Sequence, residues 1–563
     1  MVNRALTFIL LIVTSSAIAA QPAANGELLY NGIRLPAQWP PRLSETPKRA
    51  ATPSYLIAPP AAIPIDVGRQ LFVDDFLIER TDLKRTYHLA RYHPASPVVK
   101  PDKPWELDGK AGMAMVFSDG VWYDPKDKLF KMWYFCRGGA TAYAVSSDGI
   151  QWSKPALDVR AGTNIVQIGQ RDSSTVWLDD FEKDAGKRFK MFRSCSGGST
   201  VKGSYGLATF FSPDGIHWTE KPLLTGSCGD RSTVFYNPFR KVWVYSLRHG
   251  WGQPRQRRYY ERADLNSSPL WQAIDEPSYW VGADELDPMR EDLKIPTQLY
   301  NLDAVAYESI VLGLFTIWRG QPPTRQKPND VVLGYSRDGW SWYRPDRRAF
   351  CAISDKVGTW NFSNVQSAGG CCLIVGDQLY FYVSGRAGEA GNSNQGICST
   401  GLATLRRDGF ASMDGGQSAG SLTTRAVRFS GKYLFVNLDA PEGELRVEVL
   451  DDRGQVIAPF TRENCQSLRE NKTLVQVAWN GGADLSQLAG KPVRFRFELS
   501  NGRLYAFWVS RDSSGASRGY VAAGGPGYRL IFPHIFCSRA GAWSDTRDLR
   551  TEPSHGCRDA GLD

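Results

Sequence analysis

Side chains that commonly bind metals or form zinc sites are sparse in this sequence. Ten cysteines are scattered without a C-x-x-C pair, and there are six histidines. His88 and His93 are close enough to share a metal, but no cysteine pair precedes them to complete a zinc-finger pattern. The acidic loop around Asp284 and Asp287 has three interpretations: a calcium site, an alternative acid, or a solvated loop. We therefore expect no structural zinc and no organic cofactor, with calcium left open.

The composition favours a multidomain, all-β protein and argues against a nucleic-acid partner. At 563 residues and 62.6 kDa, the chain has room for two to four domains. Aromatic residues make up 12%, with 54 glycines and 33 prolines, which favours an all-β fold with many turns. The net charge of +9 is spread along the chain without a basic stripe, so nucleic acid is not an expected partner. The positive charge has two readings, namely solubility and binding of anionic glycans.

The first residues are typical of an export signal. Arg4 precedes a short apolar run over 5–13, and Ala17-Ile18-Ala19 fits a small-residue cleavage site. This predicts a signal peptide over 1–19 and a secreted or periplasmic protein, with an uncleaved anchor as the alternative. No later stretch approaches about 20 apolar residues, so we expect no membrane span. Residues 20–64 are expected to form an N-terminal linker.

A repeated motif organises the middle of the chain. The pattern S-x-D-G-x-x-W occurs at Asp148, Asp214 and Asp338, and degenerate copies surround Asp264 and Asp408. Asp-Gly suits a tight turn, because glycine accepts positive φ and aspartate bonds its own backbone. Strand-like runs lie between the copies, and the alternative is five unrelated hairpins. We predict a five-bladed β-propeller over 65–413, with a strand at 70–76 closing the last blade.

A second domain is expected after the repeats. Residues 414–424 have the composition of a linker. The run 444–449 alternates strictly, as do Val493, Phe495, Phe497 and Leu499 with their charged neighbours. A period of two with one polar face predicts an antiparallel β-sandwich over 425–510. Residues 511–563 lose this periodicity and are expected to form an irregular tail.

The repeats followed by a sandwich resemble a known class of enzymes. With the runs 65–76, 229–238, 405–413 and 431–437, they are similar to the five-bladed propeller glycoside hydrolases of family 32 and its relatives, families 43, 62 and 68. Within that class, the chain most resembles secreted family-32-like bacterial proteins. The resemblance covers roughly residues 65–525 and implies a set of three carboxylates at the openings of the blades.

The carboxylates that the resemblance implies can be placed one by one. Asp119 stands where the family has its nucleophile or base, and Asp230 stands where the family has a sugar-binding carboxylate, although the Arg-Asp order of that motif is inverted here. The family's Glu-Cys pair, which holds the general acid, is absent. Asp303 or Glu308 would replace it, and strand alternation allows only one of them to face the axis. Turn, ion-pair and other structural roles remain the alternatives for these residues.

Other residues could contact a sugar in such a site. The candidate substrate-binding residues are Arg231, Tyr300, Trp360, Asn364 and Gln366, with Arg248 and His249 as weaker candidates. Glycosidic cleavage needs one protonated acid and one carboxylate on the opposite side of the bond. The sequence, with the resemblance, thus predicts a secreted glycoside hydrolase that acts on an oligo- or polysaccharide. The expected substrate is a plant or algal glycan, and a fructoside or other furanoside is the first candidate. The alternative is a non-catalytic carbohydrate-binding or interaction propeller.

Overall fold

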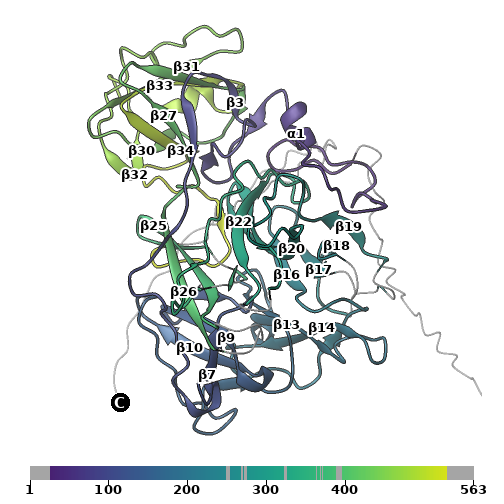
Figure 1. The fold of residues 1–563 in the computed structure, drawn as a ribbon. Helices are drawn as coiled ribbons and strands as arrows, with labels where there is room; N and C mark the ends of the chain where they lie inside the picture. Colours follow the sequence, from purple (N-terminus) through teal and green to yellow (C-terminus); the bar gives the residue numbers. More distant parts are fainter. Residues whose placement is uncertain are drawn as a thin grey trace, which may run out of the picture. The chain divides into compact units, whose positions relative to one another are not determined.

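The computed structural model describes residues 26–248, 254–267, 271, 275–322, 326–362, 364–367, 369–370, 372–388, 396–482 and 484–528. In these ranges the chain is almost entirely β, which confirms the expected all-β class (Figure 1). Helical structure in the described ranges is limited to α1 (Ser54–Ile57), η1 (Pro104–Glu106), η2 (Arg137–Gly139), η3 (Ala185–Lys187) and η4 (Leu485–Leu488). None of the described helices is long and apolar enough to cross a membrane. The predicted signal peptide lies outside the described residues.

We divide the strands over 107–406 into five groups in chain order. Groups two and three are separate four-stranded sheets, whereas groups one, four and five belong to one sheet of 15 strands. Group one contains β7 (Ala111–Met115), β8 (Val121–Asp124), β9 (Leu129–Cys136), β10 (Thr141–Ser146) and β11 (Ile165–Gln167), with β6 (Leu107–Asp108) beside β7. Group two contains β12 (Ser174–Leu178), β13 (Phe189–Ser196), β14 (Tyr205–Ser212) and β15 (Leu223–Leu224). Group three contains β16 (Thr233–Asn237), β17 (Val242–Arg248), β18 (Arg257–Arg262) and β19 (Ser278–Val281). Group four contains β20 (Gln298–Glu308), β21 (Ile310–Trp318) and β22 (Asn329–Ser336), and group five contains β23 (Asn364–Ser367), β24 (Leu373–Val375), β25 (Gln378–Arg386) and β26 (Ile397–Arg406).

Hydrogen bonds at the start of each group place neighbouring groups side by side. They run from Val176 N to Asp119 O at 2.7 Å, from Ser173 Oγ to Ser232 O at 3.0 Å, from Thr233 Oγ1 to Leu302 O at 3.2 Å, and from Gly369 N to Ser118 O at 3.3 Å. These bonds join group one to two, two to three, three to four, and five to one. Polar segments that lie far apart in the sequence therefore meet where the groups begin.

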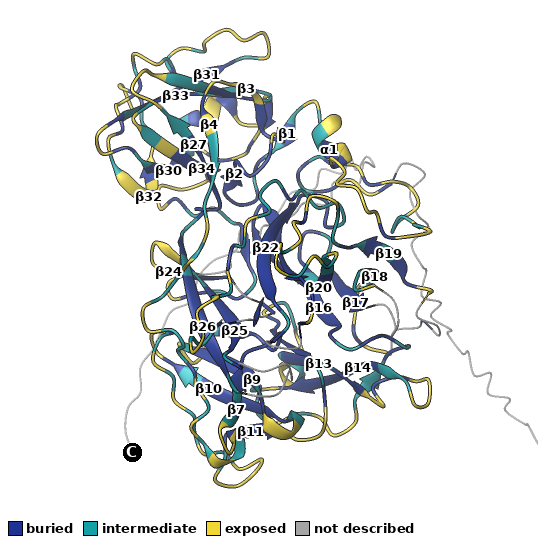
Figure 2. Cartoon of the chain, in the orientation of Figure 1, coloured by how far each residue is buried: buried dark blue, intermediate teal, exposed yellow. Residues whose placement is uncertain are grey.

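The strands of these groups are buried because both of their faces are covered. All nine residues of β21 (IVLGLFTIW) are buried, as are all eight of β22. Figure 2 shows this burial in the strands, with exposed residues on the connecting loops. The largely apolar run of β21 is typical of a strand in a sheet that is packed on two sides.

The repeated motif forms the turns that the sequence predicts. In the first copy, Ser146 Oγ accepts a hydrogen bond from Gly149 N at 2.8 Å, and Asp148 Oδ1 accepts one from Ile150 N at 2.8 Å. Gly149 has φ 75°, which a residue with a side chain rarely adopts. The copies at Asp214 and Asp338 repeat this arrangement. The copy at Asp408 does not, because its buried carboxylate instead pairs with Arg69 at 2.7 Å.

The strand that completes group five is not the one that the sequence indicates. Residues 70–76 were expected to close the last blade, but β2 (Gln70–Leu71) pairs with β34 (Gly502–Ser510) near the end of the chain. β5 (Arg91–Tyr92) pairs with β26 instead. The prediction failed because apolar alternation identifies a strand but not its partner.

Two further antiparallel sheets form from the ends of the described chain. One has the order β32-β30-β34-β27-β4 with β2 beside β34, and its remaining strands are β4 (Lys84–Tyr87), β27 (Ala411–Gly415), β30 (Tyr433–Asp439) and β32 (Asn471–Gln476). The other has the order β3-β28-β33-β31, formed by β3 (Ile78–Thr81), β28 (Gly420–Thr424), β31 (Glu444–Leu450) and β33 (Arg494–Ser500). Apolar residues of both sheets belong to one core cluster. Val493, Phe495, Phe497 and Leu499 are buried there, which confirms the predicted alternation.

Both expected linkers are partly structured. Residues 414–424 contribute to β27 and β28. In the described part of the N-terminal segment, Leu29, Ile33 and Tyr55 are buried in the same core cluster, and β1 (Ile63–Pro64) pairs with β29 (Val427–Arg428). Few of these residues alternate in polarity, so their burial had no periodic signal in the sequence.

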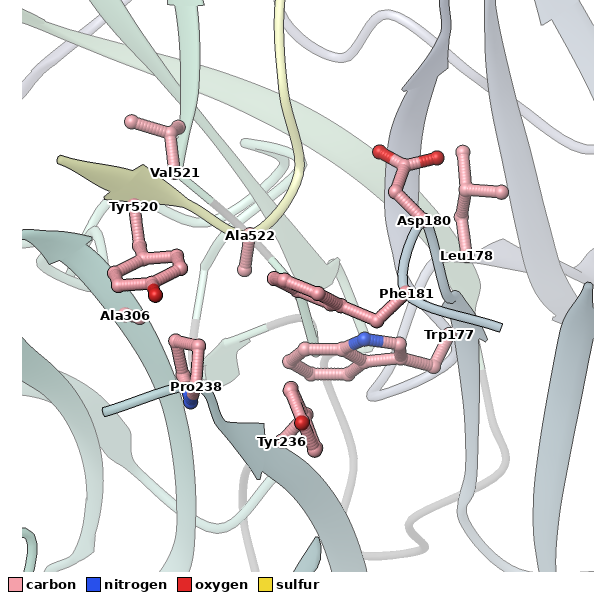
Figure 3. A pocket seen from close by; sticks show the side chains of 10 residues that line it. All are labelled: Trp177, Leu178, Asp180, Phe181, Tyr236, Pro238, Ala306, Tyr520, Val521 and Ala522. Atoms are coloured by element: carbon pink, nitrogen blue, oxygen red, sulfur yellow. The ribbon is translucent and has the colours of Figure 1, made fainter. Parts of the chain in front are cut away.

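The described part of the expected irregular tail returns to the five groups. β35 (Tyr520–Val521) pairs with the end of β20, and Tyr123 N donates to Ala523 O at 3.0 Å. Figure 3 shows Tyr520, Val521 and Ala522 lining a pocket opposite Trp177, Phe181 and Tyr236, with Ala306 and Pro238. Residues 520–524 thus contact strands of several groups, and the prediction that everything from Arg511 is irregular is wrong for β35.

Candidate functional site

Asp119 lies in the break between β7 and β8, where the backbone turns sharply. Phe117 has φ 52° and Gly120 has φ 109°, and a Cβ on Gly120 would lie 2.7 Å from Gly369 O. Asp119 has no exposed surface, and its Oδ1 lies 2.8 Å from Arg171 Nη2. Burial raises the pKa of Asp119 to about 6, although the charges of Arg171 and Arg231 oppose the shift. This carboxyl group therefore titrates close to neutral pH.

Arg231 lies at the centre of a cluster of polar and charged side chains, which also contains Asp119 and Arg171. Its guanidinium stacks on the ring of Phe117, with Cζ 3.7 Å from the ring centroid. Its Nη1 donates to Ser118 Oγ at 2.7 Å, and its Nε donates to Gln366 Oε1 at 3.0 Å. Its backbone N donates to Asp172 Oδ1 at 3.1 Å. Arg231 thereby connects the openings of groups one, two, three and five.

Asp303 enters the cluster from β20 of group four. Its Oδ2 accepts hydrogen bonds from Ser118 Oγ at 3.2 Å and from Asn301 Nδ2 at 3.0 Å. Because Ser118 also accepts from Arg231, one hydroxyl bridges the arginine and this carboxylate. Asp303 is 3% exposed, so it lies on the buried side of the cluster with Asp119.

Asp172 and Asp230 lie on the more open side of the same cluster. Asp172 is half-buried, and the side chain of Asp230 is 20% exposed and pairs with Arg248. Asp230 directly precedes Arg231, whose backbone N bonds Asp172. The two carboxylates therefore sit at the beginnings of the adjacent strands β12 and β16.

Arg231 is one of the five candidate sugar-binding residues, and the structure brings three of the other four close to it. Gln366 bonds it directly and donates from Nε2 to Asn364 Oδ1 at 2.8 Å. Tyr300 accepts a hydrogen bond at its hydroxyl from Lys327 at 3.1 Å. Burial raises the pKa of Tyr300, but the charges of Lys327, Arg386 and Arg231 outweigh this and lower it below its ordinary value.

Two sequence candidates lie elsewhere. Trp360 packs against Tyr92 at 5.1 Å between ring centroids, and a Cβ on Gly401 would lie 2.1 Å from its ring, so it covers β25 and β26. Glu308 ends β20 at φ 50° and has no exposed surface. It pairs with Arg407 at 3.2 Å and accepts from Ser517 Oγ at 2.7 Å. These contacts with the C-terminal segment are a structural role, and Asp303 rather than Glu308 joins the cluster. His249 lies outside the described residues.

The acidic loop at 284–287 is an ion-pair cluster. Asp284 Oδ1 lies 2.8 Å from Arg347 Nη1, and Asp287 pairs with Arg344. Burial raises the pKa of Asp287, but Arg344 outweighs this and holds it below its usual range. Within the described ranges, no group of three or more His, Cys, Asp or Glu residues could hold a metal ion. The carboxylates of this loop are therefore paired with arginines rather than solvated.

Sequence reasoning missed several members of the cluster. They are Ser118, Arg171, Asp172, Arg255, Arg257, Asn301, Lys327 and Arg386. A signal for two of them was present: Arg171-Asp172-Ser173 opens group two in the Arg-Asp order that the family motif has, whereas Asp230-Arg231 is inverted. The others carry no local signal, because their role depends on which strands become neighbours.

Comparisons with known proteins gave structural likenesses. Neither protein-family models nor curated proteins gave a match. An N-acetylgalactosamine deacetylase from F. plautii, solved with blood group B trisaccharide, has 14% identity and a TM-score of 0.42, over 57% of this chain and 96% of that one. A putative glycoside hydrolase from Bacteroides ovatus has 12% identity and a TM-score of 0.37, over 56% of this chain and 96% of that one. A structure from the GH130 family, described as containing glycoside hydrolases that target beta-1,2 mannosidic linkages in Candida mannan, has 12% identity and a TM-score of 0.38, over 60% of this chain and 96% of that one.

Proposed function

We propose that this chain is a secreted or periplasmic glycoside hydrolase whose five strand groups are the blades of a β-propeller. The two further sheets would then be the halves of a β-sandwich. The order of the first strands supports the propeller, since hydrogen bonds join group one to two, two to three, three to four and five to one. A ring of blades leaves few open sheet edges and gathers the beginnings of the inner strands at one place.

The main support for hydrolase activity is the pair of partly exposed carboxylates, Asp172 and Asp230, where groups two and three begin. Asp172 Oδ1 accepts a hydrogen bond from the backbone N of Arg231, the residue after Asp230. Glycosidic hydrolysis requires two carboxyl groups flanking one bond. One donates its proton to the leaving oxygen, and the other removes a proton from the water that adds to the anomeric carbon, or attacks that carbon first. Asp172 and Asp230 are our candidates for these two groups.

Asp119 and Asp303 are assigned a positioning role in this proposal. Asp119 has no exposed surface and Asp303 is 3% exposed, so neither is placed to touch a sugar in this conformation. Asp119 instead forms an ion pair with Arg171. Asp303 accepts a hydrogen bond from Ser118, which in turn accepts one from Arg231. This differs from the roles that the family resemblance implies, because burial decides which carboxylates can reach a substrate. Tyr300 is half-buried and would contact the sugar, whereas Arg231, Asn364 and Gln366 are as buried as Asp303 and would hold the cluster in place.

The test is sugar release from a broad panel of plant and algal glycans, including fructans as the furanoside first indicated by the resemblance. We expect Asp172→Asn and Asp230→Asn to lower kcat by about 100-fold or more, the usual effect of losing an acid or base group. Asp158→Asn is the matched control, because Asp158 is 79% exposed and pairs with His217 away from the cluster. Melting curves of all three variants check that they fold.

Three outcomes separate the alternatives. Release that survives in both cluster variants would contradict the assignment of the two carboxylates. Binding of glycans by the unmodified protein without any release would instead favour the non-catalytic carbohydrate-binding propeller. If release occurs, the anomer of the first product distinguishes retaining from inverting hydrolysis.

A further inference from the structure

Basic side chains outnumber acidic ones in the candidate site. Among the residues that the structure describes, four carboxylates belong to it: Asp119, Asp172, Asp230 and Asp303. The basic residues are Arg171, Arg231, Arg248, Arg255, Arg257, Lys327 and Arg386. Two of the carboxylates are already neutralised, because Arg171 pairs with Asp119 and Arg248 pairs with Asp230.

Several of the remaining cations are bonded to neutral groups. Arg231 donates hydrogen bonds to Ser118 and Gln366. The residue is 1% exposed, and its Nη2 is buried without a hydrogen-bond partner. Arg257 donates to the backbone carbonyls of Arg231 and Tyr300. In the part of the chain that the structure describes, Arg231, Arg257 and Lys327 take part in no ion pair.

Burial and the neighbouring cations both disfavour the positive charge of two of these arginines. Burial, followed by the charges of Arg231 and Arg248, lowers the pKa of Arg257 to about 9. Burial and the charge of Arg255 lower the pKa of Arg248. Holding excess positive charge out of water is costly. A site that accepts this cost is complementary to a ligand that brings the missing negative charge.

Two of the cations stand beside partly exposed positions where a ligand could reach them. Arg255 is half-buried, with Cζ 5.5 Å from the ring centroid of Tyr300 and 4.8 Å from that of Trp318. Lys327 is half-buried and contacts the hydroxyl of Tyr300. Arginine forks bind planar carboxylates and tetrahedral sulfates through paired hydrogen bonds, and lysine adds a point charge.

We propose that the glycan recognised here carries an anionic group, a carboxylate or a sulfate ester, on the sugar held by Arg255 and Lys327, with the buried charge of Arg231 behind them. This inference rests on the proposed function and specifies its substrate class. It places a charged sugar where the family resemblance would place a neutral fructoside. It also selects anionic glycan binding among the two readings of the chain's net positive charge.

The experiment uses matched pairs of polymers that differ in charge alone. Uronic acid polymers are compared with the same polymers after reduction of their carboxyl groups to alcohols, and sulfated galactans with their desulfated forms. Both kcat/KM and the dissociation constant are measured. We expect the charged member of one pair to bind at least about tenfold more tightly, with affinity falling as salt is added. Which pair responds identifies carboxylate or sulfate as the group.

Variants separate specific recognition from general attraction. Arg255→Gln and Lys327→Gln should each weaken binding of the charged polymer by about tenfold and leave binding of its neutral partner nearly unchanged. Arg160→Gln is the matched control, because it removes the same charge from an exposed position in the turn before β11. Its affinity should equal that of the unmodified protein.

The possible failures are distinct. Equal binding and equal cleavage of charged and neutral members in both pairs would overturn this inference while leaving the proposed hydrolase intact. Charge-dependent binding without any cleavage would support the anionic ligand and overturn hydrolysis. An equal loss of affinity in Arg160→Gln would overturn recognition by the cluster, because net charge alone would then explain the binding.

Discussion

At the scale of single residues, Asp119 makes the charge of the site depend on pH. Its pKa of about 6 lies above the ordinary value of 3.8, chiefly because the group is buried. The charged or titratable groups facing it are Arg171, Arg231 and Cys136, and burial raises the pKa of Cys136 to about 12, so that thiol stays protonated near neutrality. Lowering the pH through 6 therefore adds a proton to Asp119 and makes the cluster more positive.

We expect the protein to bind a uronic acid polymer more tightly at pH 5 than at pH 7.5. The sugar carboxylates stay largely ionised over this range, because such groups have pKa values of about 4 or lower. Asp119→Asn is permanently neutral, so its affinity should be nearly the same at both pH values and close to that of the unmodified protein at pH 5. Titrations at the two pH values measure this, and melting curves verify folding. An unchanged pH dependence in the variant would assign it to another group.

At the scale of elements, the S-x-D-G-x-x-W turns have the same hydrogen bonds in different surroundings. Asp148 is exposed, whereas Asp338 is 7% exposed and burial raises its pKa. In each, one carboxylate oxygen accepts hydrogen bonds from two backbone N–H groups. Water therefore reaches the carboxylate position more readily at Asp148 than at Asp338.

Replacement of these two aspartates should therefore have unequal costs. We expect Asp148→Ala to lower the free energy of unfolding by about 1 kcal/mol, and Asp338→Ala by about 3 kcal/mol, because water replaces a lost acceptor less well where the carboxylate is buried. Urea denaturation of both variants, followed by tryptophan fluorescence, gives the comparison. Equal losses would mean that the turn contributes mainly through its backbone conformation.

At the scale of the whole molecule, distant segments meet at the end of β20. Glu308 pairs there with Arg407, accepts a hydrogen bond from the backbone N of Arg69 at 3.1 Å, and contacts Ser517. Gly519 passes so close that a Cβ would lie 2.1 Å from Glu308 Oε2 and 2.7 Å from Glu308 Cα. Glycine is required at this position because the approach of two backbones leaves no room for a side chain.

Gly519→Ala should displace β35 and reduce stability. An added methyl group in a filled site costs about 1–3 kcal/mol, so we expect a lower melting temperature. Gly416→Ala is the control, because nothing lies within 4 Å of its Cβ position and its backbone is not in the left-handed region. Similar melting temperatures for the two variants would show that the C-terminal segment can shift without cost.

The sequence by itself determined the features that depend on near neighbours. The turns at Asp148, Asp214 and Asp338 follow from serine, aspartate and glycine at fixed spacing, and the buried face of β33 follows from the alternation of Phe495 and Phe497 with charged residues. Such patterns depend on backbone geometry within a few residues, so they can be read without knowing the fold.

The tertiary structure alone decided which strands pair and which charges meet. The pairing of β2 with β34 and the return of β35 to β20 join segments hundreds of residues apart, and no local pattern encodes such a choice. The same is true of the site: Ser118 and Asp303 are 185 residues apart, and their hydrogen bond exists because groups one and four begin at the same place. Burial and charge there are collective properties of several strands, which is why Asp303 joined the cluster and Glu308 did not.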